Sequence, residues 1–198
     1  DPDLVERIAA ATAVEVAATG ASWNFAPCVA VVQDVRWGRT YESFGEDPAL
    51  VTAMTSSVSG YQDNGMLATV KHYVGDGGTA DGVDQGDVRI SEAELRATHL
   101  PPYLAAIERG ARSIMVSFSS WNGVKTHGDE YLITDLLKGE LGFTGLVVSD
   151  WAGIDQIDGE PGFSAAEVAQ AINSGVDMVM VPNDYELFIE TLTAVVES

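Results

Sequence analysis

The segment Gly145-Leu-Val-Val-Ser-Asp-Trp-Ala-Gly-Ile-Asp155 indicates how the chain folds and where its chemistry lies. Its apolar run from Leu146 to Val148 is short and bounded by glycine and polar residues, which is typical of a fully buried strand. Asp150 and Trp151 follow this strand, at the position where α/β enzymes place groups that act on a sugar-sized ligand. A structural alternative stays open, because aspartate also commonly caps a turn.

The composition restricts the classes of partner. The chain has 198 residues, 46% of them hydrophobic, which suits one domain with a sizeable core. Its 30 acidic and 10 basic residues give a net charge of −20. Nucleic acids and anionic membrane surfaces are bound through lysine and arginine patches, so this charge argues against both. No apolar run approaches the ~20 residues of a membrane span.

The cysteine content and the N-terminus add two expectations. Cys28 is the only cysteine, so no intrachain disulfide is possible. The opening residues, Asp1-Pro2-Asp3, have neither the basic region nor the apolar core of a signal peptide, and there is no starting methionine. We therefore expect the chain to be an excerpt of a longer protein.

Predicted strands and helices alternate along the chain. Helix starts are marked by Asp47-Pro48, by a capping box at Ser91, by Thr134 and by Ser164. The expected strands are residues 22–26, 66–70, 113–117, 146–149 and 177–181. The expected helices are residues 4–19, 47–64, 91–110 (kinked at Pro101-Pro102), 134–142, 164–175 and 185–196.

This alternation predicts parallel βα units with right-handed crossovers. Each expected strand is followed by polar or aromatic side chains, and in a (β/α)₈ barrel that end is the active-site face. A doubly wound sheet obeys a similar rule, although no glycine-rich nucleotide-binding motif follows a strand here. We predict an α/β fold of the (β/α)₈ TIM-barrel-like type, with about five βα units in residues 1–198.

Three groups of polar residues have both a functional and a structural interpretation. Lys71-His72 closes a buried strand, where the two side chains could grip sugar hydroxyls or Lys71 could pair with a neighbouring aspartate. Arg39 could pair with Glu42 inside its long loop, donate to a ligand, or do both. The acidic loop 75–87 invites a calcium interpretation, but its spacing does not match an EF-hand, and we expect a solvated loop at the rim.

Other candidate ligands and pocket residues carry weaker signals. His99 and His127 have no motif around them, and the chain's histidines lack zinc spacing, so no catalytic zinc is expected. Met178 and Met180 alternate in an expected strand and are predicted to be core residues.

Six motifs run in order through most of the chain. They are Phe25-Ala-Pro-Cys28, Arg36-Trp-Gly-Arg-Thr-Tyr-Glu-Ser43, Lys71-His72, Gly75-Asp-Gly-Gly-Thr79, Ser119-Ser-Trp-Asn-Gly123 and Ser149-Asp-Trp151. Together they resemble glycoside hydrolase family 3, in its β-glucosidase and exo-β-glucan glucohydrolase branch.

The resemblance implies roles for particular residues. It implies that Asp150 is the catalytic nucleophile and that Arg39, Lys71 and His72 bind hydroxyls of the glycone. Trp151 matches an aromatic wall of the sugar slot. The position of Phe118, a tyrosine in some members, and that of Met115 also match the substrate pocket. No cofactor and no metal are implied.

The implied reaction is retaining, exo-acting hydrolysis that releases glucose from β-glucans or β-glucosides through a covalent glycosyl-aspartate intermediate. Two alternatives stay open: a β-xylosidase of the same family and a sugar-binding fragment without turnover. The resemblance also favours a secreted or periplasmic location.

The sequence departs from the family pattern in several places. Residues 1–198 match only part of the barrel, an upstream glycone-binding aspartate has no counterpart, and the family's second α/β sandwich domain is absent. That domain usually supplies the acid/base glutamate, so the remainder of the polypeptide is an expected partner. The loop 74–87 lacks the histidine that serves as acid/base in the N-acetylglucosaminidase branch, which favours the glucosidase branch.

Overall fold

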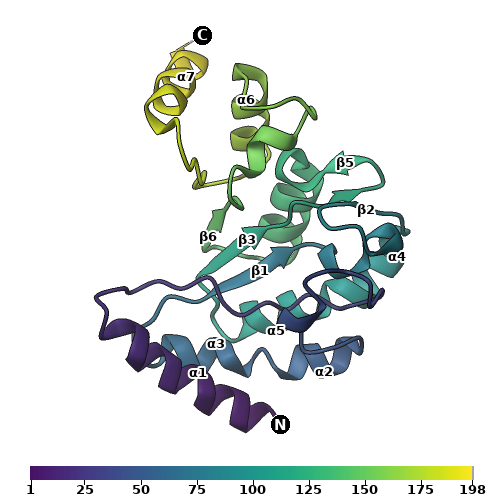
Figure 1. Cartoon of the computed structure of the whole chain (residues 1–198), viewed down its shortest axis with the longest axis vertical. Helices are drawn as coiled ribbons and strands as arrows, with labels where there is room; N and C mark the ends of the chain where they lie inside the picture. The colour runs from purple at the N-terminus through teal and green to yellow at the C-terminus, as the bar shows by residue number, and fades with distance from the viewer. Residues whose placement is uncertain (198) are drawn as a thin grey trace.

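A parallel sheet lies at the centre of the computed structural model, which describes residues 1–197 (Figure 1). Its strands β1 (Thr69–Tyr73), β3 (Ser113–Val116) and β6 (Leu146–Val148) pair in the order β1-β3-β6. All three run parallel, and the register of β1 shifts between Val70 and Tyr73. The predicted parallel βα arrangement is therefore confirmed for the central strands.

Single bridges extend this sheet on both sides. Trp23 bridges Leu67 and Cys28 bridges Lys71 next to β1, while Met178 bridges Val148 beyond β6. The segments that flank the sheet therefore run parallel to it in sequence order, as predicted. They pair with it only through isolated bridge residues and do not form full strands. The expected strands 22–26 and 177–181 were wrong in this respect, because only Trp23 and Met178 of these two segments form a bridge.

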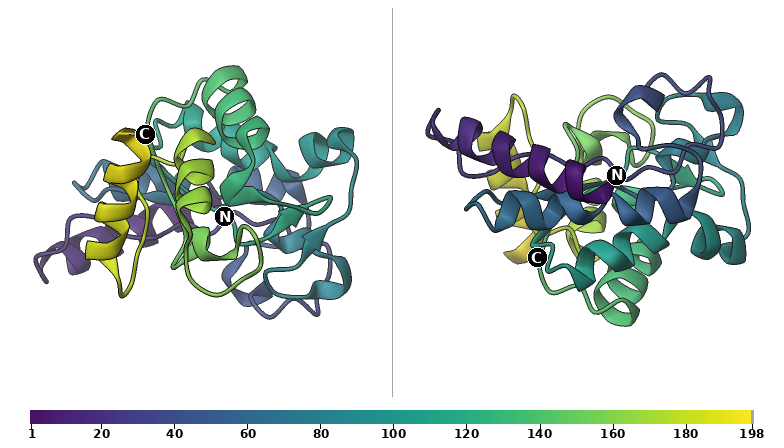
Figure 2. Two further views of the ribbon diagram at one scale, coloured as in Figure 1. Left: turned by 90° about the horizontal axis from the view of Figure 1, so that it is seen from above. Right: turned by 90° about the horizontal axis from the view of Figure 1, so that it is seen from below.

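Helices flank the sheet. α1 packs on α3 and α2 on α5 below the sheet in Figure 1, and Figure 2 shows the same helices from two further sides. α6 and α7 pack against each other at the C-terminal end of the chain. The α-helices are α1 (Pro2–Ala17), α2 (Pro48–Ala53), α3 (Ser56–Gln62), α4 (Glu92–Glu94), α5 (Pro101–Glu108), α6 (Ala165–Asn173) and α7 (Tyr185–Glu197). Two π-helical segments are η4 (Leu95–His99) and η6 (Tyr131–Glu140).

Local capping signals are confirmed at several helix starts. Ser91 and Ser164 each form a complete capping box, with Glu94 and Glu167 respectively. Asp47 accepts a hydrogen bond from Ala49 N ahead of Pro48. The side chains of these caps satisfy backbone N–H groups that have no partner within the helix, so the sequence alone identifies them.

Two helix predictions were wrong. The single helix expected over residues 47–64 is divided into α2 and α3 at Met54-Thr55. The helix expected to begin at Thr134 begins at Tyr131, because Asp129 Oδ1 accepts a hydrogen bond from Leu132 N at 3.1 Å. The Thr134 hydroxyl donates to Ser174 O instead.

A second, small sheet lies beside the C-terminal ends of the central strands (Figure 1). It joins β2 (Asp87–Val88), β4 (Ser120–Trp121) and β5 (Val124–Lys125). Asn122 and Gly123 turn between β4 and β5 with φ values of 49° and 89°, as a tight hairpin requires. Short 3₁₀ turns complete this rim: η1 (Thr40–Glu42), η2 (Asp76–Gly78), η3 (Ala80–Gly82), η5 (Thr126–Gly128) and η7 (Gly153–Gln156).

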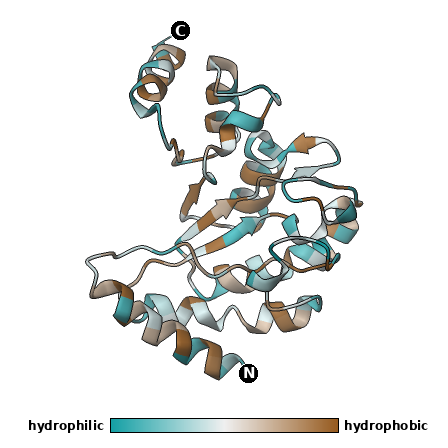
Figure 3. Cartoon of the chain, in the orientation of Figure 1, coloured by the Kyte–Doolittle hydropathy of each residue, from teal (hydrophilic) through white to brown (hydrophobic). Residues whose placement is uncertain are grey.

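The core lies between the sheet and its helices. Ile114, Leu132 and Tyr73 are fully buried, and the Tyr73 hydroxyl donates to Leu132 O at 2.9 Å. Figure 3 shows apolar residues along β3 and β6, as expected for strands covered on both faces. None of the helices within residues 1–197 has both the length and the apolar character needed to span a membrane.

Candidate active site

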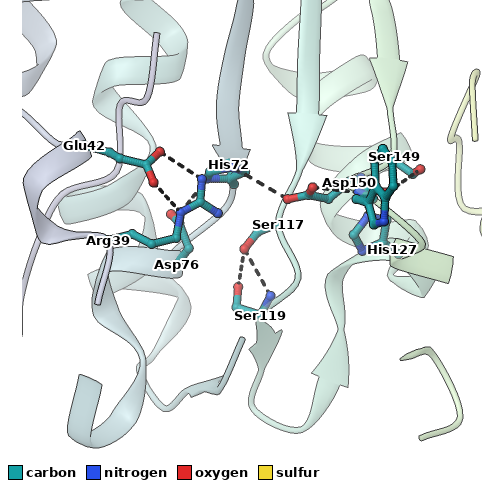
Figure 4. Close-up of polar contacts among 10 residues, drawn as sticks. Arg39, Glu42, His72, Asp76, Ser117, Ser119, His127, Ser149 and Asp150 are labelled. Atoms are coloured by element: carbon teal, nitrogen blue, oxygen red, sulfur yellow. Dashed lines mark hydrogen bonds and ion pairs between the residues drawn. The ribbon is translucent and has the colours of Figure 1, made fainter. Parts of the chain in front are cut away.

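Asp150 lies two residues beyond the end of β6, which ends at Val148. Its Oδ1 accepts a hydrogen bond from Trp151 N at 2.7 Å. Its Oδ2 is buried and makes no hydrogen bond within residues 1–197, while His72 Nε2 lies 3.6 Å away (Figure 4). One oxygen of this carboxylate is therefore fixed by the backbone and the other is left for chemistry.

His127 supports the backbone of Asp150. Its Nε2 accepts a hydrogen bond from Asp150 N at 3.0 Å, and the ring is 1% exposed. Burial, with smaller electrostatic effects of the neighbouring Lys125 and His72, lowers the pKa of His127 to about 3. The ring is therefore neutral at neutral pH, which leaves Nε2 free of a proton and able to accept this bond.

Gly153 lies close to the ring of His127. A Cβ on Gly153 would lie 2.3 Å from His127 Nε2, so only glycine fits here without a shift. His127 was not predicted as a site residue, because its partner Asp150 is 23 positions away and no local motif marks the pair.

His72 connects two carboxylates. Its Nδ1 lies 2.8 Å from Asp76 Oδ2, and its Nε2 faces Asp150 Oδ2. Both His72 and Asp76 are buried, at 2% and 7% exposure. The Asp76 contact fixes the orientation of the ring, so that its other nitrogen is held toward Asp150 (Figure 4).

The position of Asp76 corrects one expectation. The loop 75–87 was expected to be solvated at the rim, yet Asp76 and Thr79 are buried and Asp76 is tied to His72. The signal that could have identified Asp76 is its spacing of four residues from His72, but only the turn η2 brings the two side chains together.

Arg39 and Glu42 form the ion pair that the sequence suggested. Arg39 Nε and Nη2 donate to the two oxygens of Glu42 at 2.7 and 2.9 Å. Hydrogen bonds from Arg39 lower the pKa of Glu42, so this carboxylate stays ionised. A two-point pair of this kind holds the guanidinium plane in place and leaves its remaining N–H groups for another acceptor.

Arg39, His72, Asp76 and Asp150 line one cleft at the C-terminal ends of the central strands. The cleft is lined by Trp37, Arg39, His72, Asp76, Asp84, Gln85, Ser117, Phe118, Ser119 and Asp150. Four predicted site residues, Arg39, His72, Phe118 and Asp150, are therefore brought together from separate segments of the chain.

Three predicted site residues do not line this cleft within residues 1–197. Lys71 lies in β1, next to His72, and Trp151 is 62% exposed beside Asp150. Met115 is 2% exposed and pairs with Val148 between β3 and β6. Their roles in substrate binding stay predictions.

One group of metal-ligand side chains is found within residues 1–197. Ligand atoms of Cys28, His72 and Asp76 all lie within 4.8 Å of one another. The other acidic residues of the loop 75–87 form no such group within this range, so the calcium interpretation gains no support.

Comparison with known proteins identifies a family and several relatives. The profile of the glycosyl hydrolase family 3 N-terminal domain matches residues 1–198. A β-xylosidase from Formosa agariphila is 35% identical over 91% of the chain, and a periplasmic β-glucosidase from Salmonella typhimurium is 32% identical over 96%. These matches cover 27% and 26% of the two relatives, so the chain spans about a quarter of their length.

Solved structures show the same fold. An exo-1,3/1,4-β-glucanase from a Pseudoalteromonas species superposes with a TM-score of 0.94 at 48% identity, covering 100% of this chain and 26% of that one. A β-glucosidase from Listeria innocua in complex with glucose gives a TM-score of 0.92 at 31% identity, covering 100% of this chain and 29% of that one. The α/β, TIM-barrel-like fold class predicted from the sequence is confirmed, with only part of the barrel present in these residues.

Proposed function

Because the chain belongs to glycosyl hydrolase family 3, we propose that it carries the glycone-binding half of the active site of a retaining, exo-acting β-glucosidase. The observation that carries this proposal is the Asp150 carboxylate, whose Oδ2 is buried, makes no hydrogen bond within residues 1–197 and faces His72. The cleft beside it is lined mainly by charged and polar side chains, which suits the binding of sugar hydroxyls.

In the proposed reaction, Asp150 Oδ2 attacks the anomeric carbon of the terminal sugar. The bond from that carbon to Oδ2 forms as the glycosidic C–O bond breaks, and the leaving oxygen takes a proton from an acid. Water deprotonated by the same group then attacks the anomeric carbon and releases Asp150 and glucose. Arg39, His72 and Lys71 bind sugar hydroxyls, Phe118 and Met115 shape the pocket, and Trp151 stacks on the ring.

The acid/base group is proposed to come from outside residues 1–198, as a glutamate of the family's second domain. Retaining enzymes place the two carboxyl groups only ~5–5.5 Å apart. The other carboxylates that line the cleft are Asp76, which is engaged by His72, and Asp84. The remainder of the polypeptide is therefore the proposed partner of this site.

The proposed substrate is a β-linked gluco-oligosaccharide or glucoside, from which terminal glucose is released. The names of the structural relatives support glucose as the glycone: one is an exo-1,3/1,4-β-glucanase, and another was solved with laminaribiose. A second candidate, β-xylosidase activity, is favoured by the Formosa agariphila relative.

Hydrolysis of two dinitrophenyl glycosides tests these proposals. Dinitrophenolate leaves without a proton, so its release does not require the acid. We expect the 198-residue chain to cleave the β-glucoside slowly, to cleave the β-xyloside more slowly, and to leave methyl β-glucoside intact. A faster xyloside reaction would favour the β-xylosidase. Binding of glucose without any release of dinitrophenolate would favour the sugar-binding alternative.

A further inference from the structure

Cys28, His72 and Asp76 meet in the wall of the cleft, although they come from different segments. Cys28 bridges β1 at Lys71, His72 is the next residue of that strand, and Asp76 lies in the following turn η2. Their ligand atoms lie within 4.8 Å of one another, and all three residues are at most 7% exposed. The reaction proposed above uses His72 but gives no role to the thiol.

The donor set matches one class of cation. A thiolate sulfur, an imidazole nitrogen and a carboxylate oxygen together suit Zn²⁺ and softer cations such as Cd²⁺, whereas Ca²⁺ and Mg²⁺ require about six oxygen ligands. Asp76 also has one carboxylate oxygen that could bind a cation. Its Oδ2 contacts His72, while its Oδ1 is buried and has no hydrogen-bond partner within residues 1–197.

The ring of His72 is oriented for such a site. Nδ1 faces Asp76 and Nε2 faces Asp150, so a cation at Nδ1 leaves the Nε2 proton directed at a carboxylate (Figure 4). Metal-bound histidines in proteins commonly donate their other N–H in this way. The site is also reachable, because His72 and Asp76 line the cleft and Cys28 lines a second cavity beside α1 and α3.

We propose that Cys28 Sγ, His72 Nδ1 and Asp76 bind one thiophilic divalent cation per chain, with water as the fourth ligand. Binding releases the thiol proton to solvent and replaces the contact between His72 and Asp76. Where the proposed glucosidase function holds, the cation inhibits it, since it alters His72 next to the nucleophile. The cation is thus an inhibitor and not a cofactor.

Titration with Cd²⁺ alone tests the site independently of catalysis. Cadmium–thiolate bonds absorb in the ultraviolet, and Cys28 is the only cysteine, so the band reports this residue. We expect the band to saturate at one Cd²⁺ per chain, with matching calorimetric stoichiometry for Zn²⁺ and no comparable heat for Mg²⁺. Cys28→Ser should abolish the band, and Asp76→Asn should weaken binding at least about tenfold, as lost metal partners commonly do.

Asp81→Asn is the matched control, because Asp81 belongs to the same acidic loop but is exposed and pairs with Arg36. It should bind Cd²⁺ like the unmodified chain. The absence of a band in the unmodified chain would overturn the proposal, and so would equal affinity in Asp76→Asn, which would make Cys28 a lone ligand. Neither the band of the unmodified chain nor the affinity of Asp76→Asn depends on Cys28→Ser, so both tests hold even if that variant fails to fold. Inhibition without Cd²⁺ binding at Cys28 would point to another site.

Discussion

Two buried histidines should make this fold sensitive to mild acid. His99 and His127 are 3% and 1% exposed. Burial lowers the pKa of His99 from its usual 6.5 to about 4, and that of His127 to about 3. In the unfolded chain both histidines bind a proton as the pH falls below about 6.5, whereas in the folded chain both stay neutral. The stability they contribute is therefore present above about pH 6.5 and is lost as the pH falls toward their folded pKa values.

The size of the effect follows from proton linkage. Each histidine that is protonated only in the unfolded state costs about 1.4 kcal/mol of stability per pH unit. Between about pH 7.5 and 5 this amounts to about 2 kcal/mol per histidine, and about 4 kcal/mol for the two. Since domains of this size are stable by only ~5–15 kcal/mol, the loss is a large share of the total.

Urea unfolding of the unmodified chain and of His99→Gln, at several pH values from about 7.5 to about 5, checks this reasoning. His99 does not line the cleft, and the substitution keeps all carboxylates, so their contributions cancel in the difference between the two proteins. The unmodified chain should lose about 2 kcal/mol more than His99→Gln across this range. An equal loss in the two proteins would show that His99 has the same pKa folded and unfolded, and would refute the argument.

Further predictions concern the cleft. His72→Ala or Arg39→Ala should lower kcat/KM for a dinitrophenyl glucoside, by an amount equal to about 2–4 kcal/mol of transition-state binding, because each removes hydrogen bonds to the sugar. Unchanged kinetics would make the residue structural. Gly153→Ala should destabilise the fold by about 1–3 kcal/mol, because its Cβ would lie 2.3 Å from His127 Nε2. Gly38→Ala, with nothing within 4 Å of its Cβ, is the control, and equal melting temperatures for the two variants would contradict the clash.

Features encoded over a few residues were predictable from the sequence. The capping box at Ser91 depends on side chains three positions apart and forms as expected, and Ser164, predicted as a helix start, begins its helix with a capping box as well. The apolar run 146–148 ends in a polar segment, and β6 ends at the same point. The ion pair of Arg39 with Glu42 was visible for the same reason, since only three positions separate the partners.

Features that depend on distant segments were not predictable. Neither the support of Asp150 by His127 nor the bridge of Cys28 to Lys71 has a local pattern, because the contacts arise only when the strands assemble. Residues 22–26 and 177–181 were predicted as strands, but each contributes only one bridge residue, and the sequence holds no signal for that difference. The burial of Asp76 was missed because a loop rich in glycine and aspartate usually lies in solvent.

Covalent labelling tests the central claim, that Asp150 is the nucleophile, most directly. A dinitrophenyl 2-deoxy-2-fluoro-β-glucoside carries a leaving group that needs no acid, and its fluorine slows hydrolysis of the glycosyl-enzyme. After incubation with the chain, mass spectrometry should find one fluoroglucosyl group, located on the peptide that contains Asp150 and absent from Asp150→Asn. A label on Asp76 or Asp84, or one that persists in Asp150→Asn, would contradict the account.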